Sequence, residues 1–280
     1  MGFAETVLLG AIAGSTIYLG LPFGRIERVD DRVRVALAMF SVGILAFIFM
    51  DVTSHAQELV AAVVERFKHH HAGFGAIAGR FALLAAGFTL GAAGISVAER
   101  AVRRRTTRGV IAGGAADTVA IAVPDAAEAR RRSLQVGMTI AGAIGLHNFA
   151  EGLAIGVSAR AGAIGLATVL IIGFGAHNAT EGFGIVGPLG SVRPSWRWLG
   201  LAGLVGGGPT FLGTIVGYQV HSAPLELAFY ALAGGAILYV IGEVWISMRR
   251  YGHRTLGLYL LAAGFLAGVA SDLIVSYGGA

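Results

Sequence analysis

Long apolar stretches alternate with short polar connections along the whole chain. A helix needs about 20 mainly apolar residues to cross roughly 30 Å of hydrocarbon. Windows of that length predict eight membrane-spanning helices and so an all-α membrane protein. The second span carries Asp51, His55 and Glu58 in its later half, so we expect that helix to extend past the bilayer. The predicted spans are 3–22, 34–60, 74–98, 134–158, 162–187, 197–219, 225–248 and 255–277.

The connection between the third and fourth spans is much longer than the others. Its apolar stretch Val110–Pro124 is only about 15 residues long and contains Asp117, so we do not count it as a span. We interpret 99–133 as one Arg-rich loop. It divides the helices of 1–98 from those of 134–280 within a single integral domain.

Composition agrees with a protein that crosses the membrane several times. Of the 280 residues, 55% are hydrophobic and 13% are charged, and the chain has 44 glycines. The mean hydropathy is +0.73. Small residues let membrane helices approach closely where no water drives them together. The chain has no cysteine, which excludes disulfides and thiolate ligands, so a bound metal would need nitrogen and oxygen ligands.

The basic residues predict the orientation, because cytoplasmic loops hold most of the Lys and Arg. With both termini outside, the cytoplasmic connections hold all of the 21 Lys and Arg except Arg66, Lys68, Arg80 and Arg160. The net charge of +5 therefore reflects membrane topology, and we do not expect nucleic acid as a partner. The N-terminus carries Glu5, has no basic n-region and is apolar from Phe3 to Pro22. It reads as a first span and not as a cleaved signal. The expected location is the inner (cytoplasmic) membrane, in contact with lipid.

One eight-residue motif occurs twice inside apolar segments, as GLHNFAEG at 145–152 and GAHNATEG at 175–182. Each copy places a His and a Glu at i and i+4, which stacks them on one helix face about 6 Å apart along the axis. An ionised group inside a span costs roughly 2.5–3.5 kcal/mol. A chain that carries this cost twice is expected to use the groups to hold an ion. The candidate metal ligands are His147, Asn148, Glu151, His177, Asn178 and Glu181.

The two motif-bearing spans are joined by only a few residues around Arg160, which predicts an antiparallel hairpin of neighbouring helices. His147 and His177 both fall near the middle of their spans, so the two His–Glu faces are expected to converge at mid-depth. One such pair alone would fit a plain hydrogen bond between helices as well. Two copies in adjacent helices favour a metal site.

The paired motif resembles the fourth and fifth helices of the ZIP (Zrt/Irt-like) family of divalent metal transporters, bacterial type. The resemblance extends to eight spans, outside termini and a long third cytoplasmic loop. It implies a three–two–three bundle and a binuclear metal site with His147, Glu151, His177 and Glu181 as primary ligands. Asn148 and Asn178 would be shared with a second metal, and Glu151 would bridge. It also implies that helices one, four, five and six slide as a unit against the other four.

The chain departs from the family pattern at three places. Ala150 and Thr180 stand where the family usually has Pro, so straighter helices are expected. Gly208 stands before Pro209 where many bacterial relatives have a Glu. Asn178 supplies an amide where some relatives have Asp. We therefore expect one well-formed site and at most a weak second one.

The expected function is transport of a divalent transition metal into the cytoplasm by alternating access, with the metal as substrate and no cofactor. Imidazole and carboxylate ligands suit zinc, and leave iron, manganese and cadmium open. Asp51, His55 and Glu58 are candidates for an entrance, or simply mark where the helix emerges into water. Glu243 is a candidate for the exit, or pairs with Arg249 or Arg250. Two rival functions stay open: a membrane metalloenzyme, which would need a general base at an open metal position, and a metal sensor. The sequence leaves the oligomeric state open, with a homodimer as one candidate.

Overall fold

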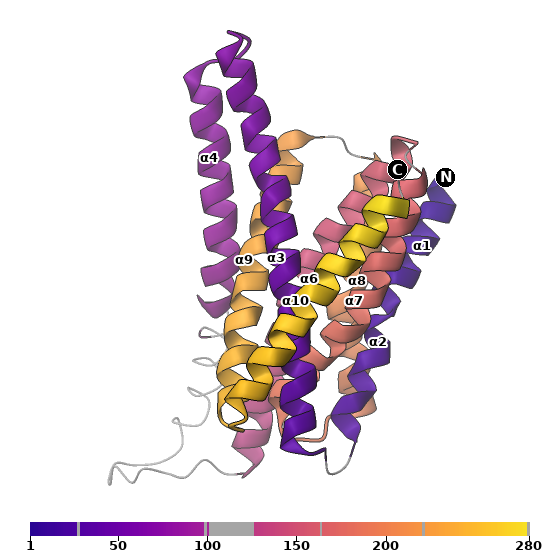
Figure 1. Cartoon of the computed structure of the whole chain (residues 1–280), viewed down its shortest axis with the longest axis vertical. Helices are drawn as coiled ribbons and strands as arrows, with labels where there is room; N and C mark the ends of the chain where they lie inside the picture. The colour runs from indigo at the N-terminus through magenta and orange to yellow at the C-terminus, as the bar shows by residue number, and fades with distance from the viewer. Residues whose placement is uncertain (27–28, 98–99, 101–125, 163, 220–221, 279–280) are drawn as a thin grey trace, which may run out of the picture.

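The computed structural model describes residues 1–26, 29–97, 100, 126–162, 164–219 and 222–278, and these residues form helices with no strand. Two short helical segments continue α1, and a π-helical turn continues α4 (Figure 1). The elements are α1 Phe3–Ser15, α2 Ile17–Gly20, η1 Leu21–Arg25, α3 Asp31–Lys68, α4 Phe74–Thr89, η2 Leu90–Gly94, α6 Ala126–Arg160, α7 Ile164–Val186, η3 Gly187–Leu189, α8 Trp196–Gln219, α9 Ala223–Arg249 and α10 Arg254–Gly278.

Seven helical segments of the described residues are long and apolar enough to cross a membrane. They match predicted spans one to four and six to eight, and α7, with 23 residues, lies where the fifth was predicted. The seven are Phe3–Arg25, Asp31–Lys68, Phe74–Val97, Ala126–Arg160, Trp196–Gln219, Ala223–Arg249 and Arg254–Ile274. The chain is thus an all-α, multi-pass membrane protein.

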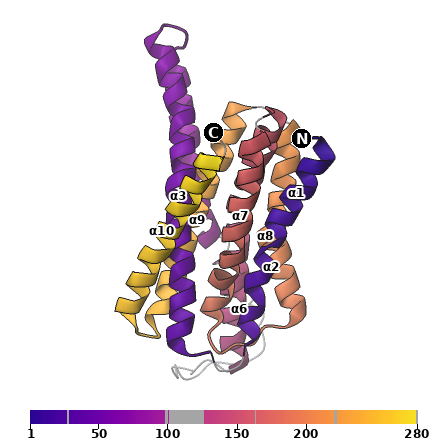
Figure 2. The ribbon, with the colours of Figure 1, turned by 45° about the vertical axis from the view of Figure 1, so that its right-hand side comes forward.

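Two helices are longer than hydropathy predicted. α6 begins at Ala126 and not at 134, so the expected 99–133 loop ends earlier; residues 101–125, with the stretch Val110–Pro124, lie outside the described residues. The added turns consist mainly of Ala and Arg, which are good helix formers, and Glu128 pairs with Arg132 one turn on. α3 runs on to Lys68, as its polar second half suggested. At about 1.5 Å per residue its 38 residues span about 57 Å, so with α4 it forms a tip above the other helices (Figure 2).

The helices pack as two groups. The first group consists of α1, α6, α7 and α8, and the second group of α3, α4, α9 and α10; the main contacts between groups are α6 with α9 and α7 with α3 and α10. Glycines bring backbones together inside each group. An added Cβ at Gly213 would lie 2.0 Å from the Phe149 carbonyl oxygen, joining α8 to α6, and one at Gly264 would lie 2.0 Å from that of Phe40, joining α10 to α3.

The two ends of the bundle differ. One end carries the α3–α4 tip, the α6–α7 turn, the start of α1 and the end of α10; we call it the tip end (Figure 1). The other carries the η1–α3, η3–α8 and α9–α10 connections and is called the basic end. It holds Arg25, Arg32, Arg34, Arg193, Arg197, Arg249, Arg250 and Arg254.

Candidate metal centre

The two His–Glu motifs lie on α6 and α7, both unbroken helices through these positions. Ala150 leaves α6 without the kink that a Pro would introduce. On α7 the Thr180 hydroxyl donates a hydrogen bond of 2.7 Å to the carbonyl oxygen of His177, one turn back. Helical geometry then presents His147 with Glu151, and His177 with Glu181, on one face of each helix.

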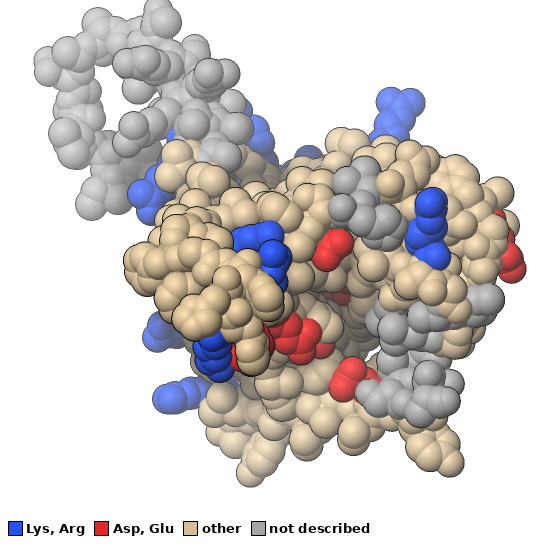
Figure 3. All heavy atoms as spheres, turned by 90° about the horizontal axis from the view of Figure 1, so that it is seen from above, with Lys and Arg blue, Asp and Glu red and all other residues tan. Residues whose placement is uncertain are grey.

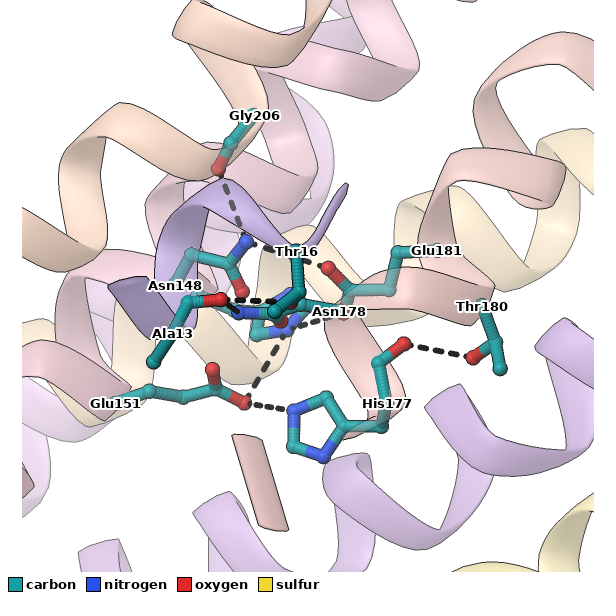
Figure 4. Close-up of polar contacts among 10 residues, drawn as sticks. Ala13, Thr16, Asn148, Glu151, His177, Asn178, Thr180, Glu181 and Gly206 are labelled. Carbon is teal, nitrogen blue, oxygen red and sulfur yellow. Dashed lines mark hydrogen bonds and ion pairs between the residues drawn. The ribbon is translucent and has the colours of Figure 1, made fainter. Parts of the chain in front are cut away.

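Each histidine reaches the glutamate of the opposite helix. Figure 4 shows this for His177 and Glu151. The His177 Nε2 and Glu151 Oε1 atoms are 2.6 Å apart. The His147 Nε2 atom lies 2.8 Å from Glu181 Oε1, without the alignment of a hydrogen bond, and 3.6 Å from Glu151 Oε1. Ligand atoms of His147, Glu151 and His177 all lie within 4.8 Å of one another. The predicted convergence of the two motifs is therefore present, with Glu151 between the two imidazoles.

The two asparagines connect this cluster to the neighbouring helices of the first group. Asn148 Nδ2 donates to Glu181 Oε2 at 3.2 Å and to the Gly206 carbonyl oxygen of α8 at 2.9 Å. Asn178 Nδ2 donates to the Ala13 carbonyl oxygen of α1 at 3.2 Å. Both amide nitrogens are thus used for positioning, which leaves the amide oxygens available as ligands.

Burial makes the cluster costly unless something positive occupies it. His147, Asn148, Asn178 and Glu181 are fully buried, Glu151 is 3% exposed, and His177, the most exposed of the six, is 15% exposed. Buried polar atoms are nearly always hydrogen-bonded. Here several acceptors have no hydrogen-bond partner among the described residues: Asn148 Oδ1, Glu151 Oε2, Asn178 Oδ1 and Glu181 Oε1.

A divalent cation fits this environment. Its charge would balance the two carboxylates, and the unpartnered oxygens and the His147 nitrogen are donors that such an ion accepts. Two imidazoles, two carboxylates and amide oxygens suit zinc, iron and manganese in their divalent forms. The described residues thus include a buried His/Glu cluster that could hold a metal ion.

A cavity of about 200 Å³ leads from the cluster toward the tip end. Glu151 lines its deep side, and Asp51 and His55 of α3 line it together with Glu226 and Tyr230 of α9. Viewed from the tip end, acidic side chains surround a hollow in the surface (Figure 3). The geometry therefore offers a cation an acidic approach to Glu151.

Of the three entrance candidates, Asp51 and His55 line the cavity and Glu58 does not. His55 lies 3.6 Å from Asp51 Oδ1 and stacks on the Tyr230 ring with centroids 5.7 Å apart. Glu58 approaches His55 at 3.4 Å, but its side chain is 74% exposed and does not line the cavity. Sequence reasoning missed Glu226 and Tyr230, although an acidic residue at the start of a predicted span was a visible signal.

Two other predicted positions lie away from the cluster. Glu243 is half-buried on α9, 17 positions beyond Glu226 and so about 25 Å farther toward the basic end. Position 208, which matches the Glu of many bacterial ZIP-family relatives, does not face the cluster. A Cβ at Gly208 would meet only Leu204, which is 62% exposed. The register of α8 turns this position outward and instead directs the Gly206 carbonyl to Asn148.

No family model matches the chain, and no curated protein matches it. The fold and the candidate centre therefore rest on the residues of this chain alone.

Proposed function

We propose that the protein carries a divalent transition metal across the membrane through this centre, as a ZIP-like transporter. The observation that supports this most is the buried set of acceptor oxygens without a hydrogen bond around Glu151 and Glu181, on two helices in the middle of a membrane bundle. Such a site is expensive in hydrocarbon unless it holds a cation. The cavity from the tip end gives that cation a route.

The proposed topology has eight spans, with α7 as the fifth. α6 and α7 form a two-helix hairpin between three spans before and three after, which is the ZIP-like three–two–three order. An even number of spans puts both termini on one side, in keeping with α1 beginning and α10 ending at the tip end. The positive-inside rule then assigns the basic end to the cytoplasm and the protein to the cell inner membrane.

Loading would begin at Asp51, His55 and Glu226 and end at the centre. The glutamates balance the ion's charge, and the histidines supply neutral nitrogen. On the basic side of the centre the described core is tightly packed: Val42, Leu45, Ile140, Ile144 and Ile185 are each 0% exposed. This arrangement supports a state open toward the tip end and closed toward the basic end.

Release requires the packed side to open, and we propose that the first group slides against the second. At several described glycines, an added Cβ would lie within 3 Å of a backbone atom of a neighbouring helix. In each of these cases the two helices belong to the same group. Between the groups, the close glycine contacts are with side chains. An added Cβ at Gly184 would lie 3.1 Å from Ser41 Oγ, and one at Gly187 would lie 3.1 Å from Ala38 Cβ. Two internally locked bodies with a looser boundary support such a motion.

The proposed cargo is zinc, with iron, manganese and cadmium as competitors, and one ion per transport cycle. The structure offers one cluster among its described residues, and the outward position of Gly208 argues against a carboxylate there completing a second site.

Uptake of radioactive zinc into proteoliposomes tests the proposal. Replacing a ligand-supporting group costs 10–100-fold in metal affinity, so Glu181→Gln, which removes a direct ligand, should lower uptake at subsaturating zinc by about 100-fold or more. Glu65→Gln is the matched control, because Glu65 lies on the exposed tip with its side chain 58% exposed. Equal uptake by wild type and Glu181→Gln, with both correctly folded, would refute transport through this centre.

A further inference from the structure

A second cavity, of about 400 Å³, lies at the basic end, between the ends of α3, α9 and α10. Val35 and Met39 of α3 and Met248 of α9 form an apolar wall, each at most 3% exposed. Trp245 lines the cavity one turn before Met248. This cavity shares no lining residue with the cavity that opens from Glu151 toward the tip end, so it is separate from the metal centre and from its entrance.

The rim of the cavity is cationic. Arg249, the last residue of α9, and Arg254, the first of α10, both line it, together with His253. Within the part of the chain that the structure describes, no carboxylate pairs with either guanidinium, whereas Arg132 pairs with Glu128. The rim therefore presents two positive charges that no carboxylate of the described residues pairs with.

The backbone between the two arginines makes an unusual turn. Gly252 has φ 72° and His253 has φ 53°, and His253 is one of two described non-glycine residues in the left-handed region. That region is unfavourable for residues with a side chain and tends to be retained at ligand clamps. The turn reverses the chain so that α9 and α10 bring Arg249 and Arg254 to one cavity.

We propose that this cavity binds the headgroup of an anionic phospholipid. The phosphate lies between Arg249 and Arg254, since guanidinium groups bind phosphate through paired charged hydrogen bonds. The glycerol and the start of an acyl chain lie on the apolar wall. That wall, and the exposed Ile246 and Leu258 on the same two helices, favour a lipid over free phosphate. The ends of membrane helices are also the depth at which headgroups lie.

Native mass spectrometry of the whole protein in neutral detergent tests this site, by titration with phosphatidylglycerol, phosphatidylcholine or inorganic phosphate. We expect phosphatidylglycerol to bind about tenfold tighter than phosphatidylcholine, and Arg249→Gln with Arg254→Gln to remove that preference. Arg249→Lys with Arg254→Lys keeps the charges and should retain most of it. Arg32→Gln with Arg197→Gln removes two exposed arginines of the same end that do not line the cavity, and should change nothing.

A second measurement locates the lipid. In a chain whose only tryptophan is Trp245, after Trp196→Phe and Trp198→Phe, phosphatidylglycerol with brominated acyl chains should quench fluorescence at a lower mole fraction than the brominated phosphatidylcholine. The proposal is overturned by equal quenching by the two lipids, by equal loss of binding in the Arg32 and Arg197 control, or by inorganic phosphate competing as well as the lipid. Zinc uptake enters none of these readouts, so the result is independent of the transport proposal.

Discussion

A cross-link between the two helix groups would separate a sliding carrier from a fixed metal site. The Cβ position of Gly184 on α7 lies 4.0 Å from Cβ of Ser41 on α3. Disulfides form with Cβ atoms about 3.5–4.5 Å apart, so Ser41→Cys with Gly184→Cys can be bridged with little backbone movement. Both positions are buried, and the natural chain has no cysteine that would compete.

Once oxidised, the bridge fixes α7 to α3 and holds the groups in the observed register. Disulfide geometry tolerates a change of only about 1 Å between the Cβ atoms, so a slide of several ångströms is prevented. The cross-linked protein should lose most zinc uptake while binding about one zinc per chain, because no ligand of the centre is changed. Reducing agent should restore uptake, and each single cysteine variant should be insensitive to oxidant. Full uptake by the oxidised double variant would refute sliding between these groups.

Three further predictions follow from the packing and the donor set. Gly213→Ala places a Cβ 2.0 Å from the Phe149 carbonyl oxygen, so it must push α8 away from α6 and lengthen the Asn148–Gly206 hydrogen bond. We expect about 2 kcal/mol of destabilisation, measured by thermal unfolding, and weaker zinc binding, measured by titration. Gly242→Ala, with nothing near its Cβ, should instead be neutral or stabilising, and identical behaviour of the two variants would contradict the packing argument. Gly208→Glu should leave metal content at about one ion per chain, since position 208 faces outward, and a rise to two would count against that orientation. Zinc uptake should increase from about pH 5.5 to about pH 7.5, because the carboxylates and imidazoles must lose protons before they bind metal; uptake that is flat across this range would speak against these ligands.

Much of the fold could be predicted because apolar length marks a span. The hairpin of α6 and α7 and the meeting of His147, Glu151, His177 and Glu181 followed from spacing within single helices and a short connection. The extension of α3 past residue 60 was expected from its polar second half, but the start of α6 at Ala126 was not predicted, because hydropathy detects only the part of a helix inside lipid.

The rest depended on contacts between helices distant in sequence. The outward orientation of Gly208 could not be predicted, because the register of α8 against α6 is set by glycine contacts such as Gly213 with Phe149, which no local pattern reveals. Glu226 and Tyr230 were missed because nothing in the order of the spans says that α9 lies beside α3 at the tip end.

The division of roles between the two groups supports the proposed mechanism. Every candidate ligand lies on α6 or α7, and the two asparagines are held by α1 and α8, so the whole centre and its supports belong to the first group. The residues of the proposed entrance, Asp51 and His55 on α3 and Glu226 on α9, belong to the second group. Movement of one group past the other would therefore change which side reaches the centre without breaking a ligand contact. That arrangement suits the proposed transport, because access to the ion is exchanged while its ligands stay together on α6 and α7.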